Sequence, residues 1–279
     1  MPWEYSDEYY TEYTRTTWNE SARAYVDLMR NLQPFHSETL ARLRARPGEH
    51  ILDLGTGPGE PALTIAGAVG AEGRVTGVDL SEKMVEIADQ VRAARKISNT
   101  EFQVMDCSKL QLPDASFDAA ISCFGFQIFT TPEKAAAEAY RVLRPKGRIV
   151  ATVWSTGDKV PFLDVIIGPM LEHAEPDETG YLPTPYETGG PGEMITFLET
   201  AGFRRAEEHR VTHVMRFQNE QAYLDSLLQA TPIGHSLSEE PPEVQQEVLE
   251  KTRANLRNWT TPEGILLPAE CVIAGASKP

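Results

Sequence analysis

The sequence contains few cysteines and no long hydrophobic run. Three of its 279 residues are cysteine, and Cys107, Cys123 and Cys271 stand far apart, with no C-x-x-C pair. This arrangement indicates neither a disulfide framework nor a metal site, and a sparse, odd count is typical of a reducing cytosol. No apolar stretch approaches the length of a membrane-spanning helix, and the first residues lack the basic and apolar regions of a signal peptide. We therefore expect a cytoplasmic protein with no metal and no membrane partner.

Basic residues are also in deficit. Lys and Arg number 26 against 41 Asp and Glu, which gives a net charge of −15. Because an acidic surface repels phosphate backbones, we expect no nucleic-acid partner. A chain of this length with 41% hydrophobic residues is long enough for one large α/β domain with a well-filled core. The composition leaves the oligomeric state open, a homodimer included.

The most informative stretch runs from His50 to Glu60. It has the pattern of a buried strand, then a glycine-rich turn, then a helix. Glycine allows the tight turn and a close approach of backbone to ligand, and the helix at roughly 61–69 directs its N-terminal amides toward that ligand. A second strand, Arg74–Asp79, ends in an acid that is placed to accept hydrogen bonds from ribose hydroxyls. The pattern indicates a nucleoside site at the carboxyl edge of a parallel sheet.

The spacing of the glycines bears on which nucleoside binds. Gly55, Gly57 and Gly59 alternate with other residues and precede Glu60, whereas the dinucleotide fingerprint is G-x-G-x-x-G. The carboxylate of Glu60, and that of Asp53 before the turn, would repel a pyrophosphate in a partly dry site. S-adenosylmethionine carries a ribose, an ammonium and a sulfonium, and suffers no such repulsion. A nicotinamide-dependent oxidoreductase on a similar sheet is the competing enzyme class.

Five motifs in order extend this pattern along the chain. They are Asp53–Gly59, Val78–Met84, Phe102–Cys107, Leu112–Ser122 and Tyr140–Val150. On these motifs the chain resembles the class I S-adenosylmethionine-dependent methyltransferases, from about residue 50 to residue 154. The combination is most similar to the branch that contains the ubiquinone/menaquinone-biosynthesis methyltransferases and many small-molecule methyltransferases.

The resemblance implies a fold, a cofactor and site residues. The fold is α/β, a doubly wound and mostly parallel sheet of seven strands that is Rossmann-like, with N-terminal helices and a helical insertion before the last strand. The cofactor is S-adenosylmethionine, and the product S-adenosylhomocysteine. Asp79 is then the ribose acid, and Asp106 faces the adenine amino group. The motif residues expected at the cofactor are Asp53, Gly55, Thr56, Gly57, Gly59, Asp79, Leu80, Met84, Asp106, Cys107 and Cys123.

We divide the chain into three parts. Residues 1–48 are predicted to form a helical lid of two helices separated at Pro34. Within it, Trp18 and Tyr25 either fasten the first helix to the sheet or cover the cofactor, where a π face favours the sulfonium. Residues 49–154 form the cofactor-binding core, and residues 155–279 complete the sheet.

Strands and helices are expected to alternate through the core. The predicted strands lie near 50–54, 74–79, 101–105, 117–122 and 147–154, and the helices near 60–70, 82–95 and 132–143. A helix ending at Gly202 then precedes an antiparallel hairpin of 207–217 and 268–278. Two segments are expected to cover the acceptor, a Pro/Gly-rich one at about 155–193 and a helical insertion at about 219–260.

Methyl transfer from a sulfonium is an in-line displacement. The protein mainly aligns acceptor, methyl and sulfur, and excludes water. A general base is needed only if the acceptor holds a proton when it attacks. The candidate bases are His36, His173 and His235, each also consistent with an ordinary packed or solvent-facing histidine. Tyr181 and Tyr186 are further candidates for the pocket.

Aromatic residues indicate the kind of acceptor. Phe124, Phe126 and Phe129 follow the fourth predicted strand, where the family places residues that border the transferable methyl; ordinary core is the alternative. Together with Trp154 they favour an apolar or aromatic acceptor. We expect methyl transfer, at oxygen or carbon, to a small and largely apolar or aromatic metabolite such as a natural-product intermediate. If the protein is not an enzyme, the alternative is a non-catalytic module that binds S-adenosylmethionine or a nucleotide.

Overall fold

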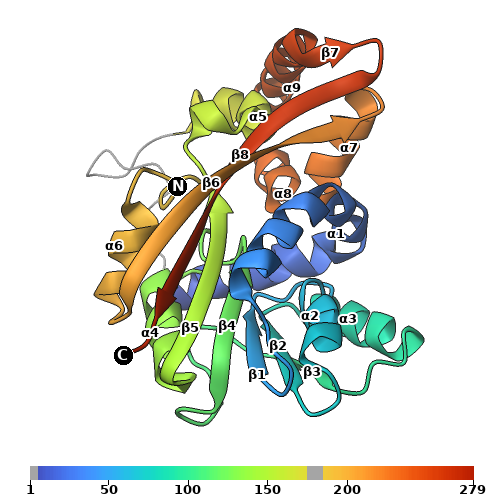
Figure 1. Cartoon of the computed structure of the whole chain (residues 1–279). Helices are drawn as coiled ribbons and strands as arrows, with labels where there is room; N and C mark the ends of the chain where they lie inside the picture. Colours follow the sequence, from blue (N-terminus) through green and yellow to red (C-terminus); the bar gives the residue numbers. More distant parts are fainter. Residues whose placement is uncertain (1–5, 175–184) are drawn as a thin grey trace.

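A computed structural model describes residues 6–174 and 185–279. Its centre is a mostly parallel sheet in which the strands follow one another in the order β3, β2, β1, β4, β5, β8, β6 (Figure 1). Their bounds are β1 His50–Leu54, β2 Arg74–Asp79, β3 Thr100–Val104, β4 Phe117–Cys123, β5 Leu143–Trp154, β6 Arg204–Phe217 and β8 Gly264–Ser277. The predicted doubly wound sheet of seven strands is confirmed, and a two-residue strand, β7 Thr260–Thr261, pairs with β8 beside it.

The pairing of the strands brings several carboxyl ends to one edge of the sheet. β1 pairs in parallel with β2 on one side and with β4 on the other, and β2 pairs in parallel with β3. The chain order reverses between β1 and β4, so the sheet has its topological switch point there. In doubly wound sheets ligands bind in the crevice outside the carboxyl ends at such a point. The fold therefore places the glycine-rich turn after β1 at the expected site.

Two hydrophobic layers cover the sheet. On one face lie the C-terminal half of α1 Asp7–Leu43, α2 Ala62–Val69 and α3 Glu82–Ala94. On the other lie α4 Pro132–Val142 and α6 Glu193–Thr200. Because both faces are covered, β1 is buried along nearly its whole length rather than on one face alone. The helices predicted at 60–70, 82–95 and 132–143 are confirmed.

The N-terminal segment is one helix, so the predicted break at Pro34 is wrong. A proline removes the amide that would bond to the carbonyl four residues earlier, here that of Arg30. Pro34 and Arg30 are both exposed, so water can satisfy that carbonyl. On the other side of the same turns Leu32 and Phe35 are buried against the sheet. The packing of this face keeps α1 continuous through the proline.

The β6–β8 hairpin extends beyond the other strands and carries further helices (Figure 1). The predicted insertion between the last two long strands is confirmed as α7 Glu220–Ala230, α8 Pro232–Ser238 and α9 Pro242–Leu256, followed by a short 3-10 turn at Arg257–Trp259. The segment 155–193 contains a second 3-10 turn, Gly157–Lys159, and a helix that the sequence did not indicate, α5 Pro161–Leu171. Pro161 occupies its first position, where the fixed φ of proline suits a helix.

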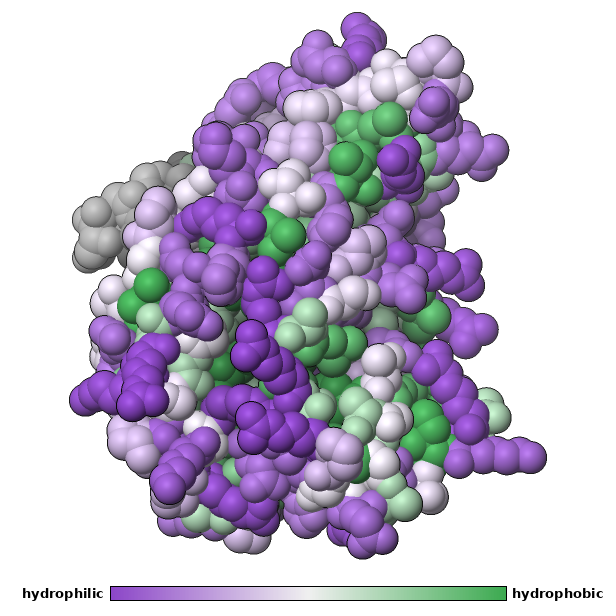
Figure 2. Space-filling view, viewed as in Figure 1, coloured by the Kyte–Doolittle hydropathy of each residue, from purple (hydrophilic) through white to green (hydrophobic). Residues whose placement is uncertain are grey.

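The surface of the molecule is mainly hydrophilic in the view of Figure 2, with hydrophobic side chains gathered in small groups. Across residues 6–174 and 185–279, no helix combines the length and the apolar character that a bilayer crossing requires. The hydrophobic residues are instead concentrated in the two layers on the faces of the sheet.

Arg148 of β5 fastens the end of α1 to the sheet, and we predict that the Arg148→Ala variant is destabilised. Its guanidinium donates to the carbonyls of Leu43 and Arg44 at 2.6 and 3.0 Å and pairs with both oxygens of Glu49 at 2.7 and 2.8 Å. The Glu49 side chain is only 13% exposed, so the substitution leaves a partly buried charge without its partner. We expect the free energy of unfolding to fall by about 2–4 kcal/mol in urea titrations.

An exposed arginine of β6 provides the control for this measurement. The Arg216→Ala variant should change the free energy of unfolding by less than about 0.5 kcal/mol. A loss of equal size in the two variants would contradict the structural role assigned to Arg148.

Candidate active site

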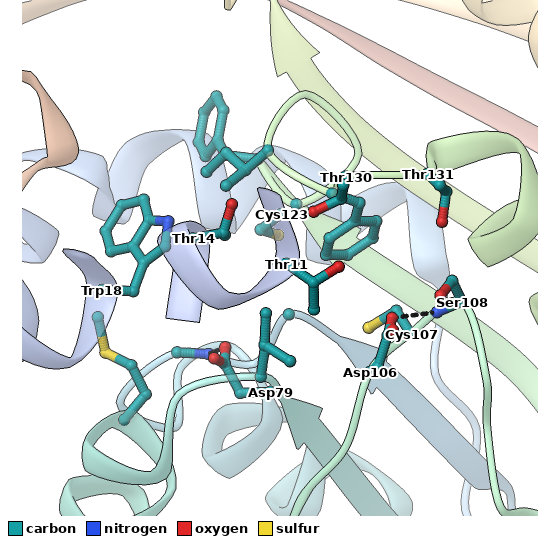
Figure 3. Close-up of a pocket in the computed structure, with 18 of the residues that line it drawn as sticks. Thr11, Thr14, Trp18, Asp79, Asp106, Cys107, Ser108, Cys123, Thr130 and Thr131 are labelled. Atoms are coloured by element: carbon teal, nitrogen blue, oxygen red, sulfur yellow. Dashed lines mark hydrogen bonds between the residues drawn. The ribbon is translucent and has the colours of Figure 1, made fainter. Parts of the chain in front are cut away.

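A cavity lies at the carboxyl edge of the sheet, against the N-terminal half of α1 (Figure 3). The empty space between its walls is about 720 Å³, including space open to solvent. Its walls come from α1, from the turns after β1, β2 and β3, and from the turn after β4. The lining residues are Thr11, Thr14, Trp18, Tyr25, Gly55, Gly57, Asp79, Leu80, Met84, Asp106, Cys107, Ser108, Cys123, Phe124, Gly125, Ile128, Phe129, Thr130 and Thr131.

Asp79, at the end of β2, organises the glycine turn. Its Oδ2 accepts a hydrogen bond from the N–H of Gly57 at 2.8 Å, and its Oδ1 accepts one from the N–H of Ser81 at 2.9 Å. Burial raises the pKa of Asp79, and these backbone donors oppose the rise. A carboxylate offers about four lone-pair sites. Both oxygens therefore keep the capacity to accept from hydroxyls of a molecule in the cavity.

The three glycines of the turn have two different roles. Gly55 and Gly57 line the cavity with φ of +71° and +53°, and a Cβ at Gly55 would lie 3.1 Å from the ring of Phe129. Gly59, with φ of +106°, is outside the lining; a Cβ there would lie 3.1 Å from Leu63 and 3.2 Å from Ala88. The first two glycines leave backbone open to a ligand, whereas Gly59 allows the turn to pack against α2 and α3.

Asp53, Thr56 and Glu60 also lie outside the cavity lining. Asp53 is fully buried, and its Oδ2 accepts from the Thr56 hydroxyl at 2.7 Å. Its Oδ1 has no hydrogen-bond partner among the described residues, and burial raises the pKa of Asp53 to about 7. The Glu60 carboxylate pairs with Arg95 at 2.5 Å and accepts from Thr64. The argument that Glu60 repels a pyrophosphate is therefore wrong, because Arg95 and Thr64 hold that charge away from the cavity.

The turn after β3 supplies another wall. The Oδ1 of Asp106 accepts from the N–H of Ser108 at 2.8 Å, drawn as a dashed line in Figure 3. Cys107 lies beside it, and Cys123 comes from the end of β4. Burial raises the pKa of both thiols well above its ordinary value. The two cysteines are therefore neutral, and they present polarizable packing surface rather than nucleophiles.

One face of α1 covers the cavity. Thr11, Thr14, Trp18 and Tyr25 recur at the three-, four- and seven-residue intervals that place side chains on the same side of a helix. In Figure 3, Thr11, Thr14 and Trp18 project from α1 on one side, and Asp79 and Asp106 lie on the other. The rings of Trp18 and Tyr25 meet edge to face with centroids 5.2 Å apart. This geometry supports the second of the two roles weighed for these aromatic residues, that of a cover.

Phe124 occupies a strained position at the wall formed after β4. Its φ is +61°, a left-handed conformation that bulky residues rarely adopt, and such strain is concentrated at functional sites. Its ring stacks on that of Trp154 with centroids 4.2 Å apart, and Trp154 is itself held edge to face by Phe35. Phe126 instead belongs to the core on the other face of the sheet. The segment thus divides into cavity residues and a core residue.

The candidate bases His36, His173 and His235 are not among the residues that line the cavity. His36 is buried on α1, and burial lowers its pKa to about 4. His173 follows α5 and lies 3.7 Å from Glu247 of α9. His235, on α8, lies 3.2 Å from Glu20 and packs edge to face on Tyr13. Tertiary structure thus buries His36 and gives His173 and His235 partners elsewhere in the fold.

Sequence reasoning missed several residues of the site. The missed lining residues are Thr11, Thr14, Ser108, Gly125, Ile128, Thr130 and Thr131. Helical spacing from Trp18 was a usable signal for Thr11 and Thr14. Tyr181 lies outside the described residues, and Tyr186 is outside the lining. Among the residues that the structure describes, no group of three His, Cys, Asp or Glu side chains could hold a metal ion.

The buried Asp53 predicts a pH dependence of stability. Its pKa is about 7 in the folded protein against an ordinary value of 3.8, so between pH 4 and 7 the folded state keeps a proton that the unfolded state has released. The stability of the wild-type protein, taken relative to that of the Asp53→Asn variant, should fall as pH rises, by up to about 1.4 kcal/mol per pH unit. It should then stay constant above about pH 8. Urea titrations of both proteins from pH 4 to 8 measure this difference, and a difference that does not vary with pH would contradict the prediction.

Three comparisons place this fold and site among known proteins. Residues 51–147 match a family model described as a methyltransferase domain. A ubiquinone/menaquinone biosynthesis C-methyltransferase of Geotalea daltonii is 35% identical over 116 residues, which cover 41% of this chain and 49% of that protein. An uncharacterized 37.1 kDa protein in transposon TN4556 of Streptomyces fradiae is 42% identical over 131 residues, 47% of this chain and 34% of that protein. The chain thus spans from a third to a half of the length of these two relatives.

Similarity of structure extends further than similarity of sequence. The crystal structure of the YcgJ protein from Bacillus subtilis superposes with a TM-score of 0.60 over 87% of this chain and 97% of that one, at 17% identity. At that identity the match establishes the fold. The motif order, the strand order and the matching domain model agree: residues 51–147 form a methyltransferase domain, and the sheet has the Rossmann-like fold of the class I S-adenosylmethionine-dependent methyltransferases.

Proposed function

We propose that this protein transfers the methyl group of S-adenosylmethionine to a small, largely apolar acceptor held between α1 and the turn after β4. The observation that carries the proposal is the position of Asp79. Its carboxylate is fixed by the N–H groups of Gly57 and Ser81 at the edge of a cavity that α1 covers. An acid at this point suits the two hydroxyls of a ribose, each of which can donate a hydrogen bond.

The residues present fit the cofactor along the whole cavity. Asp79 would hold the ribose. Leu80 and Met84 on one side and Asp106 and Cys107 on the other would enclose the adenine. The methionine part would lie along the open backbone of Gly55 and Gly57. Trp18 and Tyr25 would present aromatic faces near the sulfonium, an arrangement that attracts a cation.

The charges of the lining favour this cofactor over a dinucleotide. The lining contains the carboxylates Asp79 and Asp106, and its described residues include no Lys, Arg or His. A pyrophosphate would find like charges and no cation there, whereas an ammonium and a sulfonium are attracted. This argument replaces the one from Glu60.

The remaining lining supports an apolar acceptor. Phe124, Ile128 and Phe129 form an apolar wall, and the hydroxyls of Thr11, Thr14, Thr130 and Thr131 border it. Such a mixture suits a small molecule with an apolar body and a few hydrogen-bonding groups. The acidic net charge of −15 disfavours a nucleic acid.

In the proposed reaction the acceptor's electron pair forms a bond to the methyl carbon. At the same time the carbon–sulfur bond breaks, and the electron pair of that bond stays on sulfur. The chain contributes alignment and the exclusion of water. With His36, His173 and His235 outside the lining, we favour an acceptor that needs no histidine base. An oxygen that is already ionised meets this condition, and so does the nucleophilic carbon of a phenolate or enolate, whose own proton is released to solvent after the new bond has formed.

The cofactor part of the proposal predicts binding of S-adenosylhomocysteine and no binding of NAD in calorimetry. The Asp79→Ala variant should bind S-adenosylhomocysteine roughly tenfold to a hundredfold more weakly, because ribose hydroxyls lose their acceptor. Asp89→Ala, which removes a surface carboxylate of α3 that pairs with Arg92, should bind like the wild type. Tight binding of NAD without a response to S-adenosylhomocysteine would falsify the assignment.

The acceptor part predicts labelled products when the protein is incubated with methyl-labelled cofactor and an extract of small metabolites. The Phe124→Leu variant should lower turnover of the acceptor so found by roughly tenfold to a hundredfold, because the stack on Trp154 that positions this wall is lost. Its affinity for S-adenosylhomocysteine should stay within about threefold of the wild type.

Phe197, on α6 at the other face of the sheet, provides the matched control. Turnover by the Phe197→Leu variant should equal that of the wild type. If S-adenosylhomocysteine binds but no extract yields a labelled product, the chain is a binding module. That result would contradict the proposed methyl transfer and leave the cofactor assignment intact.

A further inference from the structure

Asn19 connects α1 to the beginning of α3. Its Oδ1 accepts hydrogen bonds from the Ser81 hydroxyl at 2.6 Å and from the N–H of Lys83 at 3.1 Å. Its Nδ2 donates to Glu82 at 2.8 Å. All three partners belong to the first turn of α3 or its cap, where backbone amides have no partner inside the helix. The carboxamide of Asn19 supplies both the acceptor and the donor that these partners require.

Ser81 continues the connection to the cofactor acid. It is fully buried, and its N–H donates to the Oδ1 of Asp79 at 2.9 Å. The other oxygen of Asp79 accepts from the N–H of Gly57. A continuous series of contacts therefore runs from Asn19 on α1, through Ser81 and Asp79, to the glycine turn.

Arg15 of α1 also reaches α3, where it pairs with Glu82 at 2.7 Å. Further polar contacts of this part of α1 lead away from the cavity. Asp7 pairs with Lys134 of α4, and both side chains are more than half exposed. Glu20 lies beside His235 of α8, and the Tyr13 hydroxyl lies 3.1 Å from that of Ser236. Exposed pairs of this kind contribute little to stability. Asn19 differs from Arg15 in that it also bonds to Ser81, whose N–H donates to the Asp79 carboxylate that faces the cavity.

We propose that Asn19 is a positioning residue that couples the seating of α1 over the cavity to the orientation of Asp79. The inference rests on the proposed function, since it assigns Asp79 to the cofactor ribose. A bound ribose fixes the Asp79 carboxylate and, through it, the Ser81 cap on which Asn19 sits. By linkage, a seated α1 favours the Asp79 geometry that binds the ribose, to the same extent.

The test uses the full chain and S-adenosylhomocysteine, so no acceptor is required. In the wild type, S-adenosylhomocysteine should slow hydrogen exchange of the amides of residues 9–25. In the Asn19→Ala variant its affinity should fall by about tenfold. The slowing of exchange over residues 9–25 should be largely lost even when the site is saturated, because the connection to α1 is broken while Asp79 remains.

A rescue variant and a control separate coupling from simple loosening of the helix. The double variant Asn19→Asp, Glu82→Gln exchanges acid and amide, so all three hydrogen bonds of position 19 can re-form. It should restore affinity and protection to the level of the single variant Glu82→Gln, which likewise lacks the ion pair with Arg15. Ser236→Ala removes a contact on the other flank of α1, and should change affinity less than about twofold.

Two results would overturn the coupling. One is an Asn19→Ala variant that binds S-adenosylhomocysteine like the wild type. The other is weaker binding with full protection of residues 9–25 at saturation, since a purely structural role at the cap of α3 would behave that way. A wild-type protein that does not bind S-adenosylhomocysteine at all would instead remove the proposed function, and this inference with it.

Discussion

The site depends on the two hydrogen bonds by which the Asp79 carboxylate holds the N–H groups of Gly57 and Ser81. They join the end of β2 to the turn after β1 and to the first turn of α3. Parallel pairing of β1 with β2 brings these three segments together. The partly buried acid is costly without such donors. The same contacts therefore stabilise the turn and leave lone pairs of Asp79 directed at the cavity.

A single helix serves both the core and the cavity because its two halves are held by different interactions. Beyond residue 28, α1 contributes Leu32, Phe35 and Leu43 to the core, and the Thr39 hydroxyl lies 2.6 Å from that of Thr152 in β5. Before it, α1 has fewer core residues, and polar side chains such as Asn19 add contacts to α3. Water can replace polar contacts far more easily than buried apolar ones, so the half over the cavity is the one able to open.

Most of the fold and the cofactor side of the site followed from short-range signals. Apolar strand patterns and the glycine spacing are local properties. Together with the family resemblance they predicted the strands, the helices between them and the positions of Asp79 and Asp106. The errors arose where a distant residue decides. Glu60 is held away from the turn by Arg95, and Pro34 is tolerated because Phe35 packs on the sheet while the proline faces water.

The sequence by itself determined that one parallel strand leads into a glycine turn and that the next ends in an acid. Neighbouring residues decide backbone conformation and strand periodicity, so both features are local. Only the tertiary structure decided which side chains share the cavity. Thr11 and Thr14 lie over the strand ends, whereas Gly59 and Asp53 lie in the packed interior. The histidines His36, His173 and His235 lie outside the cavity lining. The reason is physical: the direction of a side chain at a site depends on partners tens of residues away, which no local pattern specifies.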